Sequence, residues 1–376
     1  MALHRRPYAA FLAALLAAGC GQTPSDDRPP ARDKAAPAKK QAPFTLLASG
    51  DVLPHDSVIQ QALADGGGET YDFAPMLAGV KPAVSRADLA LCHMETVYGP
   101  DGGPFTGYPY FKSPPQVAKG AADTGYDGCS TASNHSLDLG AEGIMNTLDA
   151  MDTAGLKHAG TGRSKKEAES PALLKVKGAK VAQLSYTYDT NDIPMPRGKP
   201  WAVNITEPDR IIADARAARR AGADVVAVSI QWGTEWEEAP DRTQLRLARE
   251  LTKAGVIDVI LGTHNHVPQA YEKVNGTWVV YGMGDQIAGS MTNYSGESDP
   301  RGNWSSIARF TFAPPRKGGE RWRVSKAEFV PQLMDTGSMR VRNLGANPEG
   351  YEDVRDRIRE TVLSRGAAKD GLTMGK

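Results

Sequence analysis

The chain has 376 residues, 40% of them hydrophobic, which is enough to bury a full core in one large domain or two small ones. Lysine plus arginine and aspartate plus glutamate balance at 44 each. This balance excludes a bulk charge that would attract nucleic acid or an acidic polymer, so we expect no nucleic-acid partner. An anionic partner would have to be held by a local site.

Residues 1–19 are predicted to be a lipoprotein signal peptide that is not part of the fold. Two arginines give a positive start, the apolar run 9–18 follows, and small residues precede Cys20. The run is too short for a comfortable transmembrane span, and small residues next to a cysteine resemble a bacterial lipobox. We therefore expect Cys20 to be lipidated and to anchor an extracytoplasmic protein to the membrane of the cell envelope. Ala17 stands where the commonest lipobox has Leu, and the alternative is an ordinary secreted protein.

Residues 20–43 are predicted to form a disordered tether. They are dominated by Gly, Pro, Asp, Ala and Lys without apolar periodicity, so they bury too little surface to become ordered. The folded domain is then expected at residues 44–345. A C-terminal helix and tail follow at 346–376, because apolar residues form one stripe along 351–363.

Within the domain, apolar runs alternate with amphipathic stretches, which predicts an α/β fold. Strands are expected at residues 44–49, 88–92, 127–132, 172–176, 179–185, 224–230, 257–262 and 277–281. Amphipathic helices are expected at 208–221 and 241–254. Alternation of strand and helix predicts parallel pairing, whereas the short spacing at 176–180 predicts a hairpin. The sheets should therefore be mixed.

The last part of the domain is predicted to differ in character. Residues 282–303 are rich in Gly, Ser, Asn and Asp, so they are expected to form a long surface loop at the rim of a site. Residues 305–313 and 322–330 alternate in polarity across a turn-rich segment, which predicts a closing antiparallel pair.

Polar donors follow several of the predicted strands. The sequence places these donors, in chain order, at Asp51 and His55, His93 and Glu95, Asn134 and His135, Gln231 and Glu235, and His264 and His266. Open α/β sheets bind their ligands at the carboxyl ends of the strands. Hard oxygen and borderline nitrogen donors suit a divalent metal, so we predict a metal site at this edge.

Several of these residues have a simpler structural interpretation. Asn134, taken alone, is typical of a turn that caps the helix after it, and Asp51 could cap a turn. Trp232 is more typical of packing than of substrate contact. Glu235 could pair with Arg242 or serve the site, and the sequence does not decide between them. His264 and His266 are predicted to point the same way from an extended segment, which favours a shared metal.

Cys92 and Cys129 each end an apolar run. If the two runs are neighbouring parallel strands, the thiols lie close enough for a disulfide in an exported protein. Pairs on adjacent strands seldom have the geometry of a bridge. We therefore favour two buried free thiols.

The ordered motif set also resembles a known family. The motifs, between residues 44 and 286, are GDVLPH, HMETVYG, SNHSLDLG, GTGRS, QWGTEW, GTHNHVPQAYE and VVYGMGD. Together they resemble the CapA family of poly-γ-glutamate capsule synthesis proteins, whose domain is similar to calcineurin-like metallophosphoesterases. The resemblance implies a sandwich of two mixed β-sheets flanked by helices. It also implies a surface role in synthesis, export or anchoring of poly-γ-glutamate, alongside capsule-synthesis partners.

The resemblance further implies the roles of site residues. The implied ligands of one or two divalent metals (Mn, Zn, Fe or Mg) are Asp51, Glu95, Asn134, His264 and His266. His135 matches the imidazole that acts as a general acid or stabilises the transition state. A two-metal clamp of this kind polarises a phosphoryl or carbonyl oxygen and activates water, which is hydrolysis chemistry.

This chain departs from the family pattern at two ligand positions. Leu53 stands where active phosphoesterases have a histidine, and Gln231 replaces a histidine before the Trp-Gly pair. A neutral amide is a poorer transition-metal ligand than imidazole. His93, where the family usually has Asn, could restore part of the donor set. We assign substrate contacts to His55, His93, Gln231, Trp232 and Glu235.

Two functions remain open on the sequence. One is a metal-assisted hydrolase that acts on a phosphoester or a γ-glutamyl amide. The other is a non-catalytic lipoprotein that holds an anionic polymer at the envelope. A third possibility is a surface lipoprotein that has lost its metal site and serves only as an interaction module. The intact Asn-His and His-x-His motifs argue against it.

Overall fold

The structure, a computed structural model, describes residues 41–316 and 320–376, which belong to one compact unit. The predicted signal peptide, Cys20 and the tether up to residue 40 lie outside the described residues. In the part of the chain that is described, no helix is long and apolar enough to cross a bilayer.

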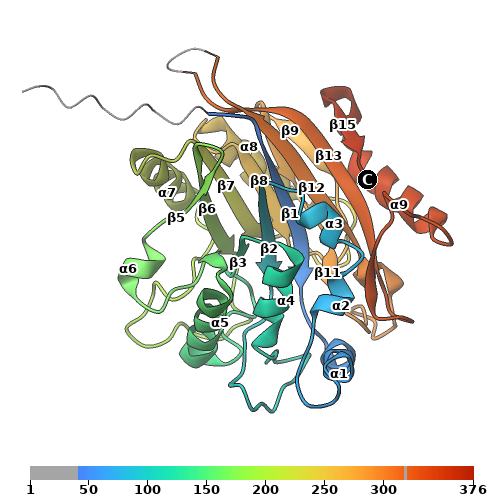
Figure 1. Ribbon diagram of the computed structural model, residues 1–376. Helices are drawn as coiled ribbons and strands as arrows, with labels where there is room; N and C mark the ends of the chain where they lie inside the picture. The colour runs from blue at the N-terminus through green and yellow to red at the C-terminus, as the bar shows by residue number, and fades with distance from the viewer. Residues whose placement is uncertain (1–40, 317–319) are drawn as a thin grey trace, which may run out of the picture. The chain divides into compact units, whose positions relative to one another are not determined.

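Two mixed β-sheets form the centre of the molecule (Figure 1). The first has the order β14 (Arg340–Asn343), β13 (Arg323–Asp335), β12 (Trp304–Ala313), β1 (Phe44–Val52), β2 (Leu89–Met94), β3 (Gly128–Ser130) and β4 (Lys157–Ala159), with β11 (Asp285–Ile287) beside β1 and β15 (Leu372–Met374) beside β13. The second has the order β5 (Ala172–Val176), β6 (Ala179–Thr187), β7 (Val225–Gln231), β8 (Val259–Thr263), β10 (Thr277–Val280) and β9 (Tyr271–Val274). Both sheets contain parallel and antiparallel pairs, as predicted.

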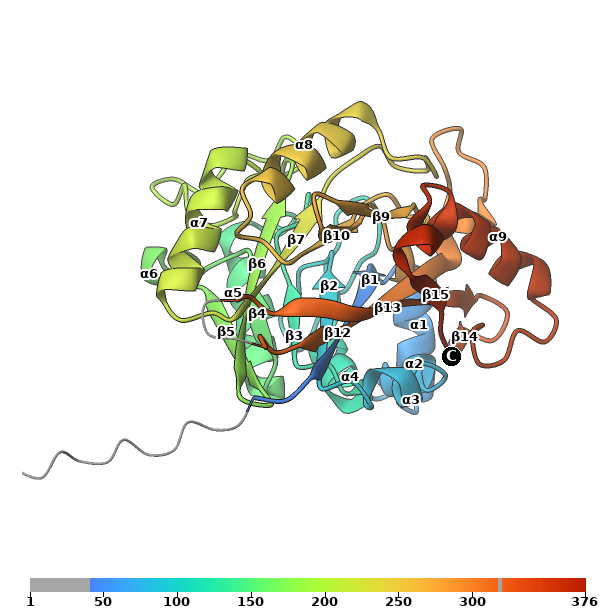
Figure 2. The same cartoon turned by 90° about the horizontal axis from the view of Figure 1, so that it is seen from above.

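Helices cover the outer face of each sheet (Figure 2). The first sheet is covered by α1 (Asp56–Asp65), α2 (Ala74–Leu77), α3 (Lys81–Val84), α4 (Gln116–Thr124) and α5 (Gly140–Ala154). The second is covered by α7 (Pro208–Arg220) and α8 (Arg242–Lys253). The short α6 (Lys165–Ala168) precedes β5, and η1 (Pro300–Asn303) precedes β12. The fold is therefore a sandwich of two mixed sheets flanked by helices, which confirms the predicted fold class.

Strand alternation explains the layers. Leu46 and Ala48 of β1 join the core between the sheets, whereas Leu47 joins the core beneath the helices. Both faces of β1 are therefore apolar, as expected for a strand buried on two sides. The C-terminal α9 (Glu352–Leu363), followed by η2 (Ala367–Asp370), adds Ile358 and Val362 to the core between the sheets.

Most predicted elements are present with small shifts at their ends. The hairpin is confirmed by the Val176–Ala179 pair, and Lys177 and Gly178 adopt the positive φ of its two-residue turn. The closing antiparallel pair is β12 and β13, and the second strand continues to Asp335.

The prediction of a surface loop at 282–303 is wrong for its first part. Residues 285–287 form β11, which pairs in parallel with β1 and is fully buried. A strand of three residues between glycines gives no alternating pattern, and its Asp and Gln resemble loop residues. The later part fits the prediction better, since Tyr294 is 72% exposed.

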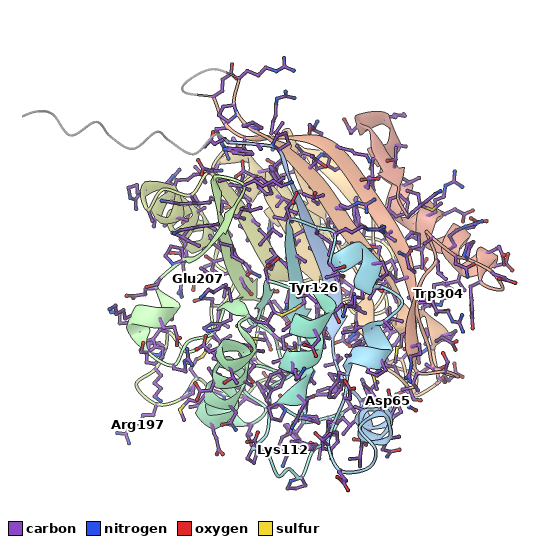
Figure 3. The ribbon with its side chains drawn as sticks, viewed as in Figure 1. Asp65, Lys112, Tyr126, Arg197, Glu207 and Trp304 are labelled. Atoms are coloured by element: carbon purple, nitrogen blue, oxygen red, sulfur yellow. A yellow bond between two sulfur atoms is a disulfide. The ribbon has the colours of Figure 1, made fainter. Side chains whose placement is uncertain are left out.

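The prediction of free thiols is also wrong. Cys92 and Cys129 are joined by a disulfide, the yellow bond in Figure 3. The two residues are direct partners in the β2–β3 register, with their Cα atoms 4.4 Å apart. That separation lies at the short end of the range for disulfides, so this register permits a bridge between adjacent strands.

Candidate metal centre

Parallel pairing collects acidic and imidazole groups around the end of β1. Asp51 pairs with Asp285 of β11 on one side and with His93 of β2 on the other. Gly50 permits this close approach, because a Cβ there would lie 1.7 Å from the carbonyl oxygen of Gly284. The backbone N–H of His264 donates to Asp51 Oδ2 at 3.0 Å, which ties the second sheet to the first.

Four of these residues form a compact cluster of possible ligands. Asp51, Glu95, His266 and Asp285 each offer one donor atom, and these atoms lie within 4.8 Å of one another. The three carboxylates are fully buried, and His266 is 6% exposed. His266 Nδ1 lies 3.1 Å from Asp285 Oδ1, so Nδ1–H donates to the carboxylate, and Nε2 is the nitrogen that a metal could take in place of a proton. A carboxylate that orients a ligand histidine in this way is common in metal sites.

The pKa values of the cluster indicate that a bound cation would stabilise its charged form. Burial and the charge of Asp285 raise the pKa of Asp51 well above its usual value, and burial and Asp51 do the same for Glu95. Burial also raises the pKa of Asp285. Burial opposes a charged His266, yet the nearby carboxylates, Asp285 first, hold the pKa of its imidazole well above the usual value. Ionised carboxylates that lie this close together and away from water raise the free energy of the folded state unless a positive charge compensates them.

Unsatisfied polar atoms provide the structural test of whether a metal fits. Asp51 Oδ1, Glu95 Oε2, His93 Nε2 and His264 Nδ1 are buried and have no hydrogen-bond partner in the described part of the chain. Such groups are rare in native structures because each loses its hydration without replacement. A divalent cation would satisfy these oxygen and nitrogen donors, so the residues present fit a metal.

His264 and His266 do not lie on an extended segment, so that prediction is wrong. Both follow β8 with positive φ, 93° and 60°, which rotates each ring separately. His264 Nδ1 lies 3.8 Å from Glu95 Oε1, outside the cluster of four, while its Nε2 lies 3.7 Å from Glu235 Oε1. Glu235 also lies 3.9 Å from His266 Nε2. It therefore faces the histidines.

Asn134 and Gln231 lie beside the cluster but are engaged within the protein. Asn134 does not cap α5; its Oδ1 accepts a hydrogen bond from Ser133 Oγ at 3.1 Å. Gln231 Nε2 donates to Glu95 Oε1 at 2.7 Å, and its Oε1 accepts from Thr187 Oγ1 at 2.8 Å. Gln231 is fully buried, so its assignment to substrate contact is corrected to a contact with Glu95.

His135 is held by a carboxylate and an aromatic ring. Its Nδ1 lies 2.7 Å from Asp138 Oδ2, and that carboxylate also accepts the backbone N–H of Phe111 at 2.7 Å. The ring of Phe111 packs edge-on against the imidazole, with centroids 4.7 Å apart. These contacts fix the orientation of the imidazole ring, with Nδ1 directed at Asp138.

Other residues assigned to the substrate take different places. Trp232 is 1% exposed and donates Nε1–H to the carbonyl of Tyr281 at 2.8 Å, so it is a packing residue. His93 is buried, with Nδ1 2.8 Å from Ser130 Oγ and Nε2 3.9 Å from Asp51 Oδ1, so it faces the cluster. His55 is half-buried, and burial and the charge of His266 lower its pKa to about 4.

Exposed tyrosines surround the centre. Tyr188 lies with its ring centroid 4.6 Å from that of His264, and Tyr108 stacks at 6.5 Å on His55. Burial and the charge of Glu235 raise the pKa of the Tyr294 phenol. Exposed tyrosines therefore lie around a buried acidic cluster.

Asp285 is the site residue that the sequence reasoning missed. It closes the quoted motif VVYGMGD, which begins with the last residues of the apolar β10. An acidic residue after a buried strand is the same signal that identified Asp51. The glycines around Asp285 favour a loop, so the sequence predicted a loop there and no ligand.

Curated relatives match less than half of the chain. The chain is 31% identical over 172 residues to the PGA biosynthesis protein CapA of Bacillus subtilis (strain 168), covering 44% of this chain and 43% of that protein. It is 28% identical over 177 residues to the capsule biosynthesis protein CapA of Bacillus anthracis, covering 46% and 42%. The chain thus spans less than half the length of these curated relatives.

Solved structures are more distant. A calcineurin-like phosphoesterase, YfkN from Bacillus subtilis, has a TM-score of 0.45 and 14% identity, covering 85% of this chain and 100% of that chain. A putative 5'-nucleotidase from Staphylococcus aureus has a TM-score of 0.49 and 13% identity, covering 85% and 58%. Likenesses of this size carry no argument about the chemistry of the chain.

The family model described as "Bacterial capsule synthesis protein PGA_cap" matches residues 45–290, more than half of the 376-residue chain. This range includes every member of the buried cluster and the His135–Asp138 pair. The chain belongs to the bacterial capsule synthesis protein family.

Proposed function

We propose that this chain is an envelope-anchored, CapA-like protein of poly-γ-glutamate capsule synthesis, export or anchoring, with a metal-assisted hydrolase site. The observation that carries the proposal is the buried group of Asp51, Glu95, His266 and Asp285. The family membership and the capsule biosynthesis roles of the relatives support the capsule pathway. The substrate would be an anionic polymer such as poly-γ-glutamate, or a phosphoester.

The proposed chemistry divides between the cluster and His135. Bound there, a divalent cation would supply Lewis acidity and lower the pKa of water. Asp51, Glu95 and His266 would hold it, and Asp285 would fix the tautomer of His266. His135 would pass a proton from Nε2 to the leaving group, because Asp138 holds Nδ1. The buried floor would exclude bulk water from this transfer.

Turnover tests the hydrolase proposal. Purified protein loaded with Mn²⁺ or Zn²⁺ is expected to hydrolyse one of three probes: p-nitrophenyl phosphate, bis(p-nitrophenyl) phosphate, or a γ-glutamyl oligomer. The measurement is release of nitrophenol or of free amine, and addition of a chelator should stop it. Inactivity of the metal-loaded protein on all three classes would contradict the hydrolase.

The second candidate is a non-catalytic protein that holds the polymer. It is favoured by Gln231, whose amide is engaged with Glu95 and stands where the resemblance to the family implies a histidine. Under this alternative, metal-loaded protein binds a γ-glutamyl oligomer in calorimetry but releases no amine from it.

Anchoring is proposed from Cys20 and its flanking residues. The Cys92–Cys129 disulfide supports export, since such bonds persist in oxidising compartments. Cys20→Ser is expected to move the protein from membranes to the soluble fraction, because a lipidated cysteine carries enough chains for stable attachment. Immunoblots of fractionated cells measure this, with Cys20 intact as the control. Unchanged membrane association of the variant would refute the anchor.

A further inference from the structure

The amide of Gln231 holds one oxygen of the buried Glu95 carboxylate. Gln231 ends β7 and is fully buried, and its Nε2 lies 2.7 Å from Glu95 Oε1. The other carboxylate oxygen, Oε2, is buried without a partner in residues 41–316 and 320–376. One oxygen of Glu95 is thus satisfied by the protein, and the other is left for a ligand.

The orientation of this amide is fixed by its other end. Gln231 Oε1 accepts the backbone N–H of Asn134 at 2.6 Å and the hydroxyl of Thr187 at 2.8 Å. A backbone N–H can only donate, so the atom that it contacts must be the oxygen. Nε2 then faces Glu95, and turning the amide to offer a carbonyl to a metal would break these contacts. In a buried site each unmade hydrogen bond is costly.

The remaining donors on this side of Glu95 are few. Asn134 Oδ1 accepts from Ser133 Oγ, and Asn134 Nδ2 donates to Asn191 Oδ1 at 3.2 Å. His264 Nδ1, 3.8 Å from Glu95 Oε1, is the one imidazole nitrogen there without a partner within the described residues. Protein metal sites normally supply at least three ligands. Glu235 faces the opposite nitrogen of the same ring, with Oε1 3.7 Å from His264 Nε2. The donors directed at Glu95 itself are therefore one imidazole nitrogen and an oxygen already bound to an amide, which fall short of that number.

We propose that the centre holds a single divalent cation, and that the Gln231 amide takes the place of a second cation against Glu95. This rests on the proposed function, because it specifies the metal content of the same centre. Glu95 then acts as a terminal ligand through Oε2. The cation lies among Asp51, Glu95, His266 and Asp285, whose donor atoms converge.

Stoichiometry of the purified full-length protein tests the proposal directly. After loading with Mn²⁺ and removal of excess, elemental analysis should find one equivalent per chain, and titration calorimetry should give one site. Electron paramagnetic resonance should show isolated Mn²⁺ without exchange coupling between two ions. Two equivalents with a coupled spectrum would overturn the single-cation centre and leave the hydrolase proposal standing. Absence of bound metal would overturn both.

Gln231→His tests the part played by the amide. An imidazole there removes the hydrogen bond to Glu95 and adds a ligand, so a second equivalent and an exchange-coupled spectrum are expected. The matched control is Gln183→His, since Gln183 is also a fully buried strand glutamine but is absent from the cluster. That control should keep one equivalent. A folded Gln231→His protein that still holds one equivalent would refute exclusion by the amide, and if the variant does not fold, the spectrum of the unmodified protein decides.

Discussion

Metal binding and turnover should be separated by two histidine variants. His266→Ala removes a donor of the buried cluster and leaves the Asp285 carboxylate without its imidazole partner. Bound Mn²⁺ should fall below one tenth of an equivalent, and turnover should disappear with it. Elemental analysis and an assay on the best probe substrate measure the two effects. Circular dichroism provides the control for folding.

His135→Ala should leave metal content nearly unchanged, because the contacts of this imidazole are with Asp138 and Phe111. Turnover should fall by a factor of roughly 10² to 10⁴, which is typical for loss of a proton-transfer group. Asp138→Asn is the companion variant; it should keep metal but disturb the tautomer of His135. Equal loss of metal in the His135 and His266 variants would contradict these separate roles.

Chelation should destabilise the protein, and the destabilisation should grow with pH. In the metal-free protein the raised pKa values of Asp51, Glu95 and Asp285 mean that the folded state keeps protons which the unfolded chain has released above about pH 4. The stability of the metal-free fold therefore falls as pH rises. His266 acts in the same direction, because its raised pKa gives stability below about pH 6.5 that is lost on deprotonation.

Metal reverses this loss, since the cation binds the ionised carboxylates in the folded state alone. At a free metal concentration about a hundred times Kd, the gain is about 2.7 kcal/mol. Thermal melts with Mn²⁺ and with chelator, from pH 5 to pH 8, should give a difference in Tm that widens towards pH 8. Asp285→Asn is the matched control, in which the widening should shrink because one carboxylate is neutral. A difference in Tm that narrows with pH would contradict the account.

The layered fold could be predicted from the sequence because its strands are long apolar runs bounded by turns. Leu46, Leu47 and Ala48 are all apolar, which is typical of a strand buried on both faces. β11 was missed because three residues between glycines carry no periodic signal. Tertiary pairing with β1, and not local propensity, forms this strand.

The sequence indicated several members of the buried cluster but not how they are arranged. Asp51 lies next to the end of β1 and Glu95 directly follows β2, which the sequence indicates by an acid after an apolar run. The positive φ of His264 and His266 depends on how the loop after β8 meets β1, and no spacing rule contains that information. The bond from Gln231 to Glu95 joins residues 136 positions apart. The Cys92–Cys129 bridge likewise depends on the register of β2 against β3.

Anomalous diffraction from crystals loaded with Mn²⁺ tests most directly the claim that the buried acidic and histidine residues form a metal centre. We expect one strong anomalous peak at ligand distance, about 2.0–2.3 Å, from carboxylate oxygens of Asp51 and Glu95 and from an imidazole nitrogen of His266. Asp285 should contact His266 beside it. Loaded crystals that show no peak among these residues, or a peak only at surface carboxylates, would contradict the account.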